Sequence, residues 1–304
     1  MKKRLIGFLL LMSTILMGSW CSVLAEKKPL TIVTSFYPMY AITQEIVQDM
    51  HEVQMIHSSN GIHGYEPSAA DIAAIYEADI FIYHSPQLES WTKNLEANKG
   101  NYSVHIIQAA AGLEMKKVPG LENITSIAGK DEANLYDPHT WLDPIEAAQE
   151  AHLIAEALSE VDSDNAEIYK ERAQQFEVRA QKLVETYRPI FESLEQKTFV
   201  TQHTAFYYLA ERFGLQQLGI AGISTEQEPS PRKMAEVMQF VERYQVDTIF
   251  IEPNVSDKIA KIISEKTGVK LVNLSPLESD PHNDLTFLEN LEQQLSVLSQ
   301  ALSK

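Results

Sequence analysis

Residues 164–187 read DNAEIYKERAQQFEVRAQKLVETY and contain no glycine or proline. Their apolar side chains recur in alternating steps of three and four residues, at Ala166, Tyr169, Ala173, Phe176, Ala180, Leu183 and Tyr187. This period predicts one helix of about 36 Å with a single apolar stripe, which Pro189 should then disturb. Because no Gly/Ser-rich linker is present, such a helix can hold two lobes at a fixed separation. The alternative is a long surface helix on a single domain.

Short apolar runs alternate with helical patterns on both sides of this helix. The runs that we predict to be strands are residues 30–34, 79–83, 104–107, 199–201, 247–251 and 269–273. A helix is predicted from Ser68 to Tyr76, and Gly214 and Gly268 stand where helices should end. Strands that alternate with helices imply parallel sheets covered by helices, which is an α/β fold.

The two halves of the chain also resemble each other. The matched strings are Val33-Thr34 with Val200-Thr201, Glu66-Pro-Ser68 with Glu228-Pro-Ser230, and Ile80–Ile82 with Ile249–Ile251. Either short common strings coincide by chance, or the chain forms two related lobes with mainly parallel sheets, joined by one long rigid helix. We expect the second arrangement, with lobes at residues 29–162 and 197–304 and the joining helix at residues 163–194.

The amino terminus has the pattern of a signal peptide covering residues 1–25. A basic start at Met1–Arg4 precedes an almost wholly apolar run from Leu5 to Gly18. Cleavage after Ala25 is one interpretation. The other is a lipobox at Gly18–Cys21 that makes Cys21 the lipid-modified first residue, and we favour it because this cysteine directly follows the apolar run. Both interpretations place the protein outside the cytoplasm, anchored at the cell surface or secreted.

Composition excludes several classes of protein. The chain has 304 residues, is 44% hydrophobic, and carries a formal net charge of −17. So negative a chain is a poor partner for nucleic acid or an anionic membrane, although it is compatible with a cation as ligand. The one cysteine excludes a disulfide framework and a thiolate zinc cluster.

Three of the nine histidines stand in unusual surroundings. His63 lies in a loop rich in Gly and Pro before a predicted helix, His139 lies between two Asp-Pro pairs beside Trp141, and His203 directly follows a predicted strand. Three imidazoles on three fixed loops are what a buried zinc site requires. Of the others, we expect His51 and His57 to face solvent, His84 to be able to line the cleft, His105 to lie in a strand, His152 on a helix, and His282 at the surface.

A closed zinc site needs a fourth ligand. Glu278 is the best candidate because it follows the last predicted strand. Asp280 is its rival, and Glu252 is a weaker rival whose alternative role is to brace its loop.

Together, these motifs resemble the zinc/manganese solute-binding proteins of bacterial ABC importers, and above all the streptococcal-type zinc-binding lipoproteins that are also described as laminin-binding. The resemblance rests on residues 33–38, 61–63, 66–68, 137–143, 201–206, 219–224, 226–230 and 276–280. It implies that His63, His139, His203 and Glu278 bind the metal, and it favours Glu278 over Asp280. It also implies a monomer that delivers Zn²⁺ to a membrane ABC permease, with binding of host laminin as an alternative or additional activity.

Residue 203 favours zinc over manganese. The resemblance implies that manganese receptors of this family bind the metal with two histidines and two carboxylates, one of them a glutamate at this position. A third imidazole instead suits the softer zinc ion. We expect no enzymatic activity, because the sequence has no His-Glu-x-x-His motif and His63-Gly-Tyr-Glu66 lacks the second histidine. Glu66 is instead expected to hold the second nitrogen of a histidine.

Overall fold

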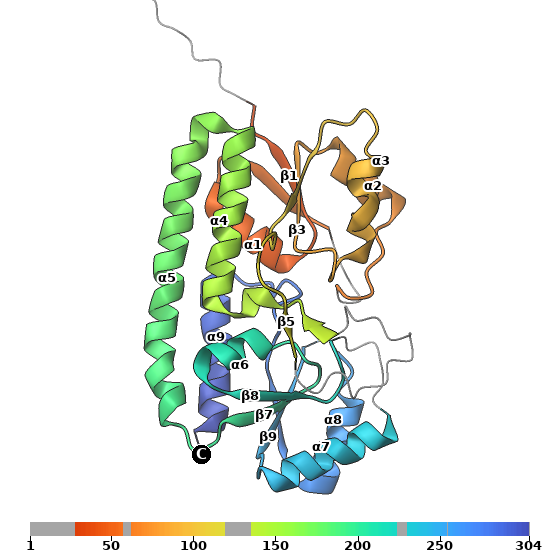
Figure 1. Ribbon diagram of the computed structural model, residues 1–304, viewed down its shortest axis with the longest axis vertical. Helices are drawn as coiled ribbons and strands as arrows, with labels where there is room; N and C mark the ends of the chain where they lie inside the picture. Colours follow the sequence, from red (N-terminus) through yellow and green to blue (C-terminus); the bar gives the residue numbers. More distant parts are fainter. Residues whose placement is uncertain (1–27, 57–61, 119–134, 224–229, 254, 304) are drawn as a thin grey trace, which may run out of the picture.

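Each half of the chain forms a four-stranded parallel sheet (Figure 1). The structure is a computed structural model that describes residues 28–303 except 57–61, 119–134, 224–229 and 254. The predicted signal peptide, Cys21 and His57 lie outside the described residues.

The first sheet contains β1 (Thr31–Thr34), β2 (Glu52–Met55), β3 (Ile80–Tyr83) and β4 (His105–Gln108). Its strand order is β2-β1-β3-β4, and every neighbouring pair is parallel. The connecting elements are α1 (Tyr37–Val47), α2 (Ala69–Glu77), η1 (Ser90–Asn94) and α3 (Leu95–Asn98). Strand β3 is buried at all positions, as its uniformly apolar sequence predicts for a strand covered on both faces.

The second sheet repeats this plan. It contains β7 (Thr198–Thr201), β8 (Gln216–Gly219), β9 (Thr248–Ile251) and β10 (Lys270–Asn273), joined through α6 (Tyr207–Phe213), α7 (Pro231–Arg243) and α8 (Lys258–Thr267). Its strand order is β10-β9-β7-β8. If the strands of each half are numbered from one to four along the chain, both sheets have the order 2-1-3-4. The expected relation between the halves is therefore confirmed. Gly214 and Gly268 end α6 and α8 in the left-handed conformation, as predicted.

One long helix connects the two halves, as expected. A short antiparallel pair, β5 (Lys116–Lys117) and β6 (Tyr136–Asp137), leads through η4 (Thr140–Leu142) into α4 (Pro144–Val161) and η5 (Ser163–Asn165). Then α5 (Ala166–Ser193) runs past both sheets along one side of the molecule (Figure 1). The last helix, α9 (Phe287–Leu302), packs against α5 and α1.

The expectation that Pro189 disturbs the long helix is wrong, because α5 continues through it to Ser193. The physical reason is tertiary packing. Phe191, one turn beyond Tyr187, is fully buried and lies 4.9 Å from the ring of Phe213, so burial of this aromatic side chain keeps the last turn helical. The predicted stripe from Tyr169 to Tyr187 does form the buried face of α5.

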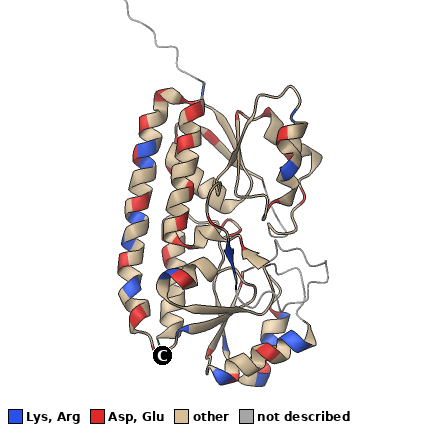
Figure 2. Cartoon of the chain, in the orientation of Figure 1, with Lys and Arg blue, Asp and Glu red and all other residues tan. Residues whose placement is uncertain are grey.

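Charged residues of both signs alternate along the outer face of α5 (Figure 2). Among the described residues, no helix combines the length and the hydropathy that a membrane-spanning helix needs. The exact division into lobes at 29–162 and 197–304 with a linker at 163–194 remains a prediction.

Candidate metal centre

His63 is presented by a turn just before α2. The adjacent Ile62 is buried in the core, and the backbone N–H of Tyr65 donates to the Ile62 carbonyl at 3.2 Å. The Tyr65 hydroxyl donates to Asp71 at 2.8 Å, and Asp71 forms a capping box with Ser68 at the start of α2. The Glu-Pro-Ser motif therefore starts the helix and fixes the end of the loop that carries the imidazole.

His139 is held by a carboxylate two residues before it. One oxygen of Asp137 accepts hydrogen bonds from the His139 backbone N–H at 2.8 Å and from His139 Nδ1 at 2.5 Å. Both residues are fully buried, and the Trp141 ring lies 5.1 Å from the imidazole. Because Nδ1 donates its proton to Asp137, Nε2 is the nitrogen left to bind a cation.

His203 is held in the same way in the second half of the chain. It lies two residues after the end of β7, and its Nδ1 lies 2.6 Å from Oε1 of Glu252, which directly follows the neighbouring strand β9. Strands β7 and β9 pair in parallel, so their carboxyl ends bring these two side chains together. Glu252 thus supports the His203 imidazole, a role that neither of our two interpretations of this residue expected.

The structure brings the four predicted ligand residues into one group. One atom from each of His63, His139, His203 and Glu278 lies within 4.8 Å of the other three. Nε2 of His139 is 3.1 Å from Nε2 of His63 and 3.4 Å from Nε2 of His203. Glu278 Oε1 is 3.4, 3.2 and 3.2 Å from Nε2 of His63, His139 and His203. Ligands arranged tetrahedrally around zinc at about 2.0–2.1 Å would lie about 3.3 Å apart, so the group already has the size of a zinc site.

The charges of the group suit a cation. Burial alone would raise the pKa of Glu278, but the three imidazoles outweigh it and hold that pKa well below its usual range. Burial also tends to lower the pKa of His203, yet the carboxylates of Glu252 and Glu278 together outweigh it and raise this pKa to about 10. For His63 burial prevails, so its pKa is lowered. Without metal, the group therefore contains a charged carboxylate and a proton on His203 that a divalent ion would replace.

Other candidates from the sequence do not join this group. Asp280, the rival of Glu278, accepts a hydrogen bond from the backbone N–H of His282 at 2.7 Å. His84 does not line a cleft, because it is fully buried and bonded to Ser85 and to Thr140. Glu66 is exposed, so the expectation that it supports a histidine is wrong. Asp137 and Glu252 have that role instead.

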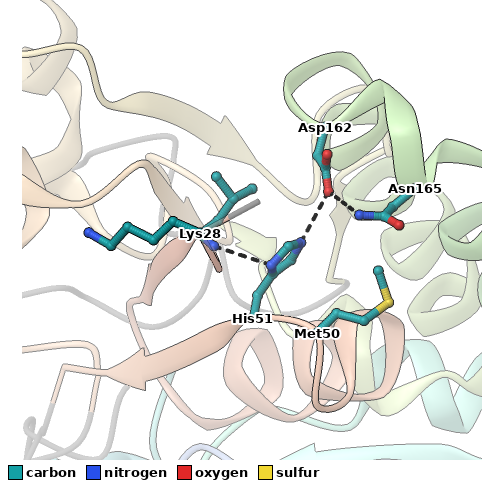
Figure 3. A pocket seen from close by; sticks show the side chains of 6 residues that line it. Lys28, Met50, His51, Asp162 and Asn165 are labelled. Carbon is teal, nitrogen blue, oxygen red and sulfur yellow. Dashed lines mark hydrogen bonds and ion pairs between the residues drawn. The ribbon is translucent and has the colours of Figure 1, made fainter. Parts of the chain in front are cut away.

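His51 was expected to face solvent, and this expectation is also wrong. Its side chain is 6% exposed, and its Nε2 lies 2.5 Å from the Tyr169 hydroxyl and 3.3 Å from Asp162. Figure 3 shows this imidazole between Lys28 and the Asp162–Asn165 turn, in a small pocket at the end of the first sheet. The pocket is lined by residues other than the four of the metal group.

We predict that Asp137→Asn lowers the zinc affinity by about 10–100-fold, the usual cost of losing a partner that orients a ligand. The carboxylate accepts from His139 on one oxygen and from the backbone N–H of Tyr207 on the other, at 3.2 Å. An amide would turn a donor toward one of these two N–H groups. A competition titration with a chelator measures the loss. Asp79→Asn, which removes the charge of a carboxylate that accepts from the Thr31 N–H far from the site, should leave the affinity unchanged.

Comparisons with known proteins give one consistent family. Residues 32–301 match the family described as "ZnuA: Zinc-uptake complex component A periplasmic". The high-affinity zinc uptake system protein ZnuA of Bacillus subtilis is 33% identical over 279 residues, which are 90% of this chain and 88% of that protein. The zinc-binding lipoprotein AdcA of Streptococcus pneumoniae is 34% identical over 89% of this chain, but this chain spans only 55% of AdcA.

Solved structures agree. A Zn(II)-bound variant of AdcAII from Streptococcus pneumoniae is 55% identical with a TM-score of 0.85, covering 90% of this chain and 99% of that one. The laminin-binding protein Lmb of Streptococcus agalactiae, described as a bifunctional protein with adhesin and metal-transporting activity, is 48% identical with a TM-score of 0.83, covering 90% of this chain and all of that one. At these identities the likeness extends beyond the fold.

Proposed function

The chain belongs to the ZnuA family of periplasmic zinc-uptake components, and we propose that it captures one Zn²⁺ with His63, His139, His203 and Glu278 and delivers it to a membrane ABC permease. The observation that carries this proposal is the group of three imidazole nitrogens and one carboxylate oxygen, each within 4.8 Å of the others. Closed four-coordination by such ligands is typical of zinc that is bound rather than used in catalysis. The family membership likewise supports a transport component, and we propose no catalytic role.

Metal analysis tests this function directly. Protein purified without added metal should contain one zinc ion per chain, and a His203→Ala variant prepared in parallel should contain much less. Competition titrations should place zinc above manganese in affinity, as the three imidazoles favour. Metal-free protein that takes up no zinc in such a titration would overturn the proposal, and zinc-dependent hydrolysis of an ester or peptide would replace it with an enzymatic one.

Zinc affinity should fall by about tenfold for each unit that the pH is lowered between about 8.5 and 6.5. In this range the raised pKa of His203, about 10, keeps a proton on the metal-free protein that zinc must displace. The raised pKa means that the competing proton is bound below pH 10, so acid weakens zinc binding and base strengthens it. Calorimetry in two buffers of different ionisation enthalpy measures the released proton. Zinc binding without proton release would contradict this assignment.

Location and anchoring are the finer part of the proposal. The family is described as periplasmic, and AdcA is described as a lipoprotein. We therefore propose that the mature protein works outside the cytoplasm as a monomer, attached through lipid on Cys21. Mass spectrometry of the mature amino terminus distinguishes a lipid-modified Cys21 from cleavage after Ala25.

Adhesion is a second candidate function, favoured by the similarity to Lmb and to the laminin-binding protein Lbp of Streptococcus pyogenes, which is 47% identical. We propose that laminin binding by this chain uses a surface other than the metal group. Surface plasmon resonance with immobilised laminin should then give the same affinity for the wild-type protein and for a variant that has lost zinc.

A further inference from the structure

The loop that carries Glu278 contains an unusual backbone conformation. Leu277, the residue directly before Glu278, has a φ of 55°. A residue with a bulky side chain rarely adopts this left-handed conformation, which glycine adopts easily. For such a residue, the conformation persists only where surrounding contacts hold it. Leu277 is buried, with 1% of its surface exposed, so its conformation is part of the packed interior.

Three contacts hold this loop. The indole N–H of Trp141 donates to the carbonyl of Pro276 at 2.9 Å. The backbone N–H of Leu277 donates to the hydroxyl of Ser275 at 3.0 Å, and the backbone N–H of Ser275 donates to the Gln294 side chain at 2.8 Å. Of these, the bond from Trp141 comes from outside this half of the chain, 135 residues away in sequence.

Trp141 lies beside the metal group. It is fully buried, and its ring is 5.1 Å from the imidazole of His139. The same side chain thus contacts one predicted ligand by its ring and the backbone beside another through its N–H. This double contact fixes the distance between the loop of His139 and the loop of Glu278.

We propose that Trp141 is a positioning residue for Glu278: its N–H holds the Pro276 carbonyl and keeps Leu277 in the left-handed conformation from which the Glu278 carboxylate reaches the three imidazoles. This inference rests on the proposed zinc-binding function. It assigns to Trp141 a role besides packing against His139, because the N–H orients a ligand from the other half of the chain before metal arrives.

The test is Trp141→Phe, which keeps an aromatic ring and removes the N–H. Zinc affinity should fall about tenfold, the lower end of the range for partners that orient ligands. Trp91→Phe is the matched control, because among the described residues the buried Nε1 of Trp91 has no hydrogen-bond partner. It should leave the zinc affinity unchanged. The visible absorption of bound Co²⁺ should change in Trp141→Phe alone, since it reports the ligand geometry.

A double-mutant cycle separates positioning from simple packing. If Trp141 acts through Glu278, the loss caused by Trp141→Phe should largely disappear in a Glu278→Gln background. An equal loss in both backgrounds, or no loss in either, would overturn the inference. Ser275→Ala, which removes the acceptor for the Leu277 N–H, provides a second variant and should lower zinc affinity in the same direction. A wild-type protein that binds no zinc would instead contradict the proposed function itself.

Discussion

Replacing His139 by alanine will lower the zinc affinity by more than the 100-fold or so that removal of a supporting residue can cost. Its Nε2 lies within 3.4 Å of the atoms from the other three residues, so its loss opens the middle of the group. The change also leaves Asp137 as a fully buried carboxylate without its imidazole partner. The same variant should therefore be less stable than the wild type even without metal.

The control for this variant is His51→Ala. His51 is also buried and hydrogen-bonded, but it lies in the pocket of Figure 3, away from the metal group. Its removal should lower the thermal midpoint of unfolding while leaving zinc affinity unchanged in a chelator competition. If both variants lose zinc equally, the loss reflects general destabilisation, and the assignment of His139 as a ligand fails.

Much of the fold was predictable because burial follows local sequence pattern. The stripe of α5 and the apolar strand β3 lie in the core as their periodicity indicates. Two strands of the parallel sheets were not predicted. Both β2 (Glu-Val-Gln-Met) and β8 (Gln-Gln-Leu-Gly) are half polar and short, so pairing with neighbouring strands forms them rather than their own sequence. Pro189 shows the converse, because packing of Phe191 overrides a local signal.

The site was predictable to a different extent. Loop position and residue type singled out the three histidines, but sequence distance hides which carboxylate reaches them, so residue reasoning left Glu278 and Asp280 open. The supporting residues were harder to find. Asp137 has a local signal, since a carboxylate two residues before a histidine can turn back onto its ring. Glu252 has none, because only the pairing of β7 with β9 places it against His203.

A His203→Glu variant should shift metal preference toward manganese, lowering the ratio of zinc to manganese affinity by at least about tenfold. Three neutral imidazoles and one carboxylate around a divalent ion give a net charge of +1, whereas two imidazoles and two carboxylates give a neutral site. The added oxygen ligand suits the harder manganese ion, and the lost imidazole weakens zinc. Zinc can still bind more tightly in absolute terms, because it stands above manganese in the intrinsic affinity order.

The structure adds a condition to this result. The Glu252 carboxylate lies 2.6 Å from Nδ1 of His203, and Glu252 is only 6% exposed. A carboxylate introduced at position 203 would therefore face two other carboxylates, those of Glu252 and Glu278. Like charges in a buried site disfavour ionisation, so the single variant should bind both metals weakly near neutral pH. Adding Glu252→Gln removes the repulsion and should restore manganese binding more than zinc binding. His203→Gln, which removes the imidazole without adding charge, separates the two contributions: if it changes the zinc-to-manganese ratio as much as His203→Glu does in competition titrations, the carboxylate is not the source of selectivity.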